Sequence, residues 1–91
     1  MKIESYKVLS RFAGISGFQR IYRFPNGYGA SVVDGRSLHS YPFYTEIAVI
    51  MFKGDSNDKF DLVYDTPVTN DVIITDGLED ETNYLEQIKN L

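Results

Sequence analysis

Few residues in this 91-residue chain could do chemistry. The sequence contains no cysteine, so no thiolate metal site is available, and His39 is its one histidine. Ser37 and Ser40 flank His39 too closely in sequence to form a nucleophile with its own general base. We therefore predict that the protein is not an enzyme, has no catalytic residue, and holds neither a metal nor another cofactor.

Two short motifs resemble ligand-binding loops but fail in their details. The segment 27–32 begins like a dinucleotide-binding fingerprint, yet it lacks the third glycine and leads into a predicted strand. The acidic segment 55–66 has Phe60 where a calcium loop needs glycine and Thr66 where it needs a bidentate glutamate. Both motifs are better explained as turns between strands.

Charge is divided unevenly along the sequence. Residues 1–44 carry six basic and two acidic side chains, whereas residues 45–91 carry three basic and eleven acidic ones. The two halves either form faces of opposite charge or cancel in space after folding. In the acidic half, the candidate partner-binding residues are Asp71, Asp76, Glu79 and Asp80. Such a run either imitates the phosphates of DNA or forms the solvated start of a helix.

Aromatic and basic residues alternate within the segment 18–24. This composition is typical of a platform for single-stranded nucleic acid, which here would use Arg20, Tyr22 and Arg23. The same rings are also expected in the core of a small sheet. The net charge of −4 disfavours a general nucleic-acid binder, because affinity for nucleic acid comes mainly from neutralised phosphates.

A polar connection rich in aromatic residues spans positions 34–45. Its candidate partner-binding residues are Arg36, Tyr41, Phe43 and Tyr44. Exposed tyrosine near arginine is typical of protein interfaces, although these rings could instead fold down over the core. We expect a protein partner to contact this connection or the acidic C-terminal half.

An antiparallel sheet must position these candidates. Two strands within 18–33 flank Asn26-Gly27, a strong signal for a two-residue hairpin loop of type I′. That loop needs positive φ at both residues and pairs Phe24 with Gly29, so the aromatic ring would cover the bare glycine backbone.

The pattern further along the chain predicts a second hairpin. The segment 46–52 is apolar on both faces and is predicted to be a central strand paired with the alternating segment 60–65. Residues 2–12 fit either a helix or a strand, and we predict a strand. Thr69 is predicted to cap a short helical turn over 70–74.

The segment 78–90 predicts an amphipathic helix, opened by a capping box at Asp76 and Glu79. Its apolar stripe holds Tyr84, Leu85, Ile88 and Leu91. We therefore predict a single domain over 1–91 of the α+β class. It has an antiparallel sheet of four to five strands, formed by two hairpins, with the C-terminal helix packed on one face.

Three segments resemble a family of small uncharacterised bacteriophage proteins. They are the hairpin 24–33, with the sequence F-P-N-G-Y-G-A-S-V-V, the strand 46–50, and the segment 64–72, which fits Y-D-T-P-x-T-x-D-V. The chain departs from the family in lacking a glycine-rich loop at 34–45 and in having Asn70 where an acid is common. The resemblance transfers no functional residue.

What the resemblance implies is a setting, namely a phage gene expressed in the host bacterial cytoplasm. We expect a non-enzymatic accessory protein that binds and inhibits a host or bacterial-defence protein. One alternative is a nucleic-acid-associated or DNA-mimic protein, and another is a structural or oligomeric phage component. We expect no membrane partner, because no segment approaches the ~20 apolar residues of a membrane span. An open sheet edge would permit a homodimer.

Overall fold

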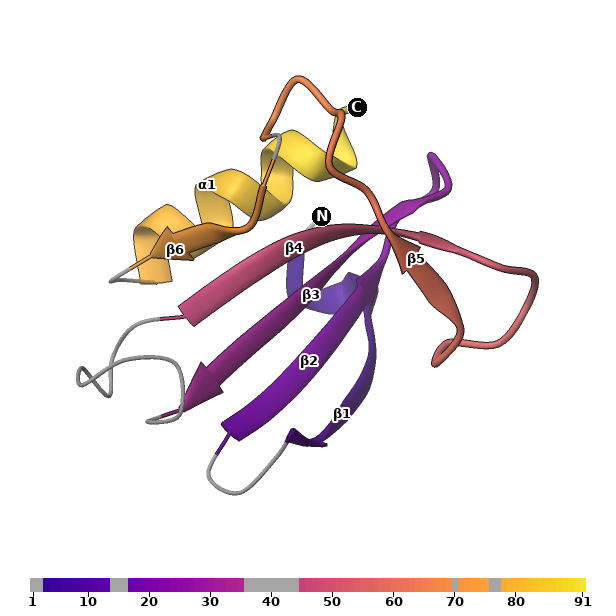
Figure 1. Ribbon diagram of the computed structural model, residues 1–91, viewed down its shortest axis with the longest axis horizontal. Helices are drawn as coiled ribbons and strands as arrows, with labels where there is room; N and C mark the ends of the chain where they lie inside the picture. The colour runs from indigo at the N-terminus through magenta and orange to yellow at the C-terminus, as the bar shows by residue number, and fades with distance from the viewer. Residues whose placement is uncertain (1–2, 14–16, 36–44, 70, 76–77) are drawn as a thin grey trace.

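The computed structural model consists of an antiparallel sheet with one C-terminal helix packed against it (Figure 1). It describes residues 3–13, 17–35, 45–69, 71–75 and 78–91. The elements are the 3-10 helix η1 (Ile3–Tyr6), strands β1 (Lys7–Ala13), β2 (Gly17–Arg23), β3 (Tyr28–Gly35), β4 (Thr45–Phe52), β5 (Phe60–Leu62) and β6 (Ile73–Thr75), and helix α1 (Leu78–Lys89). The predicted α+β class, the two hairpins and the covering helix are confirmed.

The strands lie in the order β1-β2-β3-β4-β5, and every neighbouring pair is antiparallel. One edge of β4 pairs with β3, while its other edge is shared by β6 near Thr45 and by β5 near Phe52. The apolar residues 47–50 of β4 are all buried, as a strand covered on both faces requires.

The main core lies between α1 and the sheet. The helix contacts β3 and β4, and its Leu85 and Ile88 are fully buried, which confirms the predicted apolar stripe. The sheet residues that form this core with them are Tyr22, Phe24, Ala30, Val32, Ile47, Val49 and Ile73. Tyr84 and Leu91 pack against the cluster while remaining partly exposed.

The predicted turn between β2 and β3 is confirmed. Its predicted type, I′, is wrong, and the predicted register of the two strands is wrong by one residue. Gly27 alone in this turn has positive φ, at 91°, and the Gly27 amide donates to the Phe24 carbonyl at 3.2 Å. Pro25 explains the difference, because its fixed φ suits the second position of a type I turn, which is then followed by a left-handed glycine. The loop has three residues, and Arg23 rather than Phe24 pairs with Gly29.

Asn26 links this turn to the end of α1. Its Nδ2 donates to the carbonyl oxygens of Ile88 and Lys89, both at 3.0 Å, and of Leu91 at 3.4 Å. Its Oδ1 accepts a hydrogen bond from the Tyr28 amide at 3.0 Å. The last carbonyls of a helix lack the usual helical partner, so the turn supplies donors at this end, alongside the Leu91 amide that also donates to the Ile88 carbonyl.

We predict that Asn26→Asp destabilises the protein by about 2 kcal/mol, although the two side chains have nearly the same shape. The aspartate keeps the acceptor for Tyr28 but replaces the donor with a negative charge at the negative end of the helix dipole. Urea denaturation at neutral pH measures the change, with Asn26→Ala as the comparison. If Asn26→Asp were as stable as the natural chain, Asn26 would not be a donor to α1.

The predicted helical turn over 70–74 is wrong, since residues 73–75 form β6 and pair with the start of β4. The β-branched residues of β6 favour a strand, and Ile73 and Thr75 are buried in it. Near the N-terminus, the predicted strand begins only at Lys7, because Ile3–Tyr6 forms η1.

Candidate interaction surface

Five of the candidate residues, Arg36, Tyr41, Phe43, Tyr44 and Asp76, lie outside the described residues. The predictions made for them therefore stay predictions. Of the other candidates, Asp71 is exposed beside β6, and Glu79 and Asp80 are exposed in the first turn of α1. The positive end of the helix dipole accounts for acids at that position.

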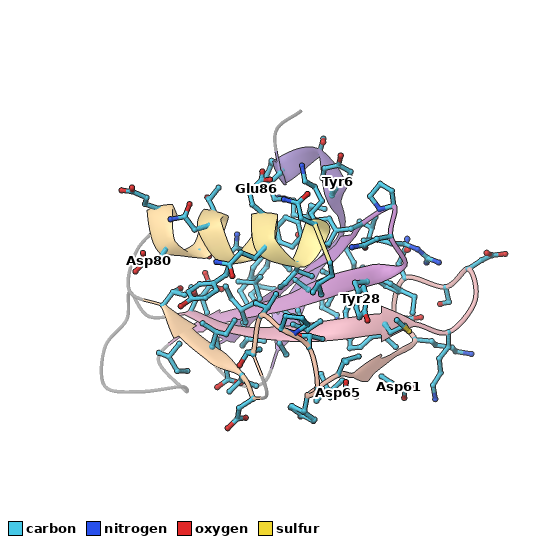
Figure 2. All side chains as sticks on the ribbon, turned by 90° about the horizontal axis from the view of Figure 1, so that it is seen from above. Tyr6, Tyr28, Asp61, Asp65, Asp80 and Glu86 are labelled. Carbon is cyan, nitrogen blue, oxygen red and sulfur yellow. The ribbon has the colours of Figure 1, made fainter. Side chains whose placement is uncertain are left out.

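The exposed carboxylates do not gather into one row. Asp71 Oδ1 accepts a hydrogen bond from the Val72 amide at 2.8 Å, so this carboxylate shapes its own turn. Figure 2 shows Asp80 at the start of α1, whereas Asp61 of β5 and Asp65, in the segment after β5, lie away from the helix. This spread does not favour imitation of a regular line of phosphates.

Arg20 and Tyr22 of β2 are used inside the protein. Arg20 forms a bidentate ion pair with Glu81 of α1, with nitrogen–oxygen distances of 2.7 and 3.1 Å, and also donates to the Tyr22 hydroxyl at 3.1 Å. Desolvation acts to lower the pKa of Arg20, but the hydrogen bonds and charge of Glu81 outweigh it and raise that pKa. Tyr22 is only 1% exposed, so neither residue is available to a nucleic acid.

Arg23 lies on the other face of β2, where it holds the turn between β4 and β5. Its Nη2 donates to the Gly54 carbonyl at 2.6 Å and its Nη1 to Asn57 Oδ1 at 3.3 Å. The guanidinium lies 4.4 Å from the centre of the Phe52 ring, in a cation–π arrangement. All three contacts are structural, so Arg23 is also occupied.

The described residue with the greatest apolar exposure is Phe12, whose side chain lies at the end of the edge strand β1. It is 85% exposed and forms an edge-to-face pair with Phe18 of β2, with ring centres 5.8 Å apart. Phe18 is itself 38% exposed. Among the described strands, β1 pairs with β2 alone, so the exposed aromatic pair borders an open sheet edge.

A polar row crosses the opposite face of the same strands. Arg11 Nε donates to Gln19 Oε1, and Gln19 Nε2 donates to Ser31 Oγ, both at 2.8 Å. The hydrogen bond from Ser56 lowers the pKa of Asp58, and the charge of Arg11 adds to this lowering. The Arg11 side chain therefore extends over the sheet toward β2, and it remains exposed to solvent.

We name the β1 edge, together with the exposed rings of Phe12 and Phe18, the aromatic edge. Sequence reasoning missed it, because it treated residues 2–12 as an uncertain strand and looked for exposed rings in the connection 34–45. The available signal was the position of Phe12, two residues before the chain-breaking Gly14, where a hairpin end carries few covering residues.

One open groove lies elsewhere, between the segment after β5 and the last turns of α1. It has a volume of about 490 Å³ and is lined by Pro67, Val68, Glu86, Gln87, Asn90 and Leu91. In the parts of the chain that the structure describes, no three histidine or carboxylate side chains come together to hold a metal ion. No helix there is long and apolar enough to cross a membrane.

Comparisons with known proteins add no relative: no protein-family model, no curated protein and no solved structure matches this chain.

Proposed function

We propose that this chain is a non-enzymatic phage accessory protein that binds, and thereby inhibits, a host or bacterial-defence protein. The phage setting rests on the resemblance of the segments 24–33, 46–50 and 64–72 to phage proteins. The binding role rests on one observation of the fold, the aromatic edge at β1.

Exposed phenylalanine in this arrangement suits protein binding. Covering a phenylalanine side chain contributes roughly 1.5–3 kcal/mol, and aromatic residues are enriched at the centres of protein interfaces. Phe12 contributes little to the core, because 85% of its surface is already open to solvent. In the free protein this ring is therefore in contact with water, and a bound partner would bury it.

We predict that Phe12→Ser removes the partner without unfolding the protein. The tagged chain is expressed in bacteria, captured by its tag, and the retained proteins are identified by mass spectrometry. The natural chain and the control Ile74→Ser, which changes an exposed apolar residue of β6, should retain the same bacterial protein. Phe12→Ser should lose it while keeping its circular dichroism spectrum and melting temperature within a few degrees.

Two results would contradict the proposal. Capture that yields no reproducible bacterial protein would count against the binding role. A partner retained equally by Phe12→Ser would place the contact away from the aromatic edge.

A further inference from the structure

We propose that the partner adds an extended, acidic segment as a new strand along the outer edge of β1. This inference rests on the proposed function and names the chemistry of the partner.

The backbone of β1 offers the template. Residues 9–13 pair with 17–21 of β2 in regular antiparallel register, after an irregularity between Lys7 and Leu9. A strand paired on one side presents its alternate N–H and C=O groups outward along the free side. An extended segment of about five residues can satisfy these groups, and strand addition of this kind is a common way of binding peptides.

The charge of β1 selects the occupant. Lys7 and Arg11 are its only charged residues, and it carries no carboxylate. Lys7 forms an ion pair with Glu4 at 2.5 Å. Arg11 forms no ion pair with a described carboxylate, and Asp58, whose pKa its charge helps to lower, lies beyond ion-pair distance. Gln19 of β2 holds Arg11 Nε, so the side chain must turn outward to bring its two terminal nitrogens to a carboxylate on an added strand.

A second copy of this chain fits the edge less well. In the antiparallel pairing that sets Ser10 opposite its own copy, Arg11 lies opposite Leu9. The two Arg11 side chains then share a face as diagonal neighbours, about 7–8 Å apart, where like charges repel. An acidic segment turns this repulsion into attraction, so charge favours a partner strand over a homodimer.

Phe12 adds selectivity for an apolar residue. It projects from the opposite face to Arg11, because neighbouring residues of a strand point to opposite faces. An added strand that alternates acidic and apolar residues therefore sets its acids on the face of Arg11 and its apolar side chains beside Phe12. This alternation is the sequence pattern that we expect in the partner.

The test uses two fluorescently labelled peptides of about eight residues, one alternating Glu with Val and the other alternating Lys with Val. Fluorescence anisotropy at low salt should show the Glu peptide binding about tenfold more tightly, and added salt should reduce that ratio. Amide NMR shifts caused by the Glu peptide should concentrate in β1 and at Phe18. Arg11→Glu should reverse the preference, while Lys53→Glu, which removes an exposed ion pair with Asp61, should preserve it.

Equal binding of the two peptides, or NMR shifts centred away from β1, would overturn the inference. So would a dimer in sedimentation experiments that Arg11→Glu or Phe12→Ser abolishes, because a second copy would then occupy the edge. The salt dependence of the natural chain keeps the test decisive even if Arg11→Glu folds poorly. If the peptide test fails but the capture experiment yields a partner that depends on Phe12, strand addition alone is rejected. If the capture experiment yields no partner, the proposed function is rejected.

Discussion

Replacing Gly29 with alanine is expected to lower the free energy of unfolding by at least ~3 kcal/mol. A Cβ atom on Gly29 would lie 2.2 Å from the backbone carbonyl oxygen of Tyr22 and 2.5 Å from Cε2 of the Phe52 ring. The ring can turn aside, but the Tyr22 carbonyl belongs to the ladder between β2 and β3 and can move only if that ladder shifts. Chemical denaturation followed by circular dichroism measures the loss, which should also lower the melting temperature by more than ~10 °C.

Gly54→Ala is the matched control for this prediction. Gly54 has a positive φ of 81° and nothing within 4 Å of its added Cβ, so the same substitution meets backbone strain without a clash. That strain costs about 1 kcal/mol. A Gly29→Ala variant no less stable than Gly54→Ala would contradict the close packing of β3 against Tyr22 and Phe52.

Replacing Glu81 with leucine is expected to cost about 2–3 kcal/mol, although it adds apolar surface to a helix face that already contacts the core. The substitution leaves the guanidinium of Arg20 largely buried, with a side chain 17% exposed, and without its carboxylate. The loss therefore comes from an uncompensated charge rather than from a missing contact. Urea denaturation of the variant at neutral pH measures it.

The double variant Arg20→Met with Glu81→Leu separates these effects. Removing both charges together should recover at least half of the stability lost by Glu81→Leu alone, because apolar side chains can replace a buried ion pair. If the double variant were no more stable than Glu81→Leu, the cost would lie in packing at the start of α1 and not in the charge of Arg20.

Much of the fold could be predicted because its patterns are local. The apolar stripe of 84, 85, 88 and 91 specifies one buried face, and the helix of the structure follows it. The alternation of 60–65 is followed only in part, because β5 ends at Leu62, and Leu62 and Tyr64 are exposed. The register of the first hairpin differs from the prediction because the two-residue loop places Pro25 in the strand opposite Tyr28, whereas in the structure Pro25 belongs to the loop. Proline before these two residues shifts the turn to three residues.

The partner of Glu81 could not be predicted from β2 or α1 separately. Glu81 lies four residues before Leu85 and seven before Ile88, so it shares the buried stripe of the helix. That spacing was a readable signal that this acid points inward. Its pairing with Arg20 depends on how α1 crosses the sheet, and no local pattern specifies a contact 61 residues apart.

The aromatic edge is hard to predict for a related reason. Phe12 is exposed because no described element packs over the end of β1. Periodicity in the sequence predicts which face of the strand a side chain lies on, but not whether another element covers that face. The interface was predicted at the connection 34–45 because that segment is rich in aromatic residues near an arginine. In the described structure, the greatest apolar exposure lies on the neighbouring hairpin between β1 and β2.

Hydrogen–deuterium exchange of the chain, alone and with its captured partner, tests the central claim most directly. If a partner strand adds to the aromatic edge, the amides of β1 should exchange at least about tenfold more slowly in the complex, while those of α1 keep their rates. Slower exchange confined to α1 or to the acidic C-terminal half, with β1 unchanged, would contradict the account.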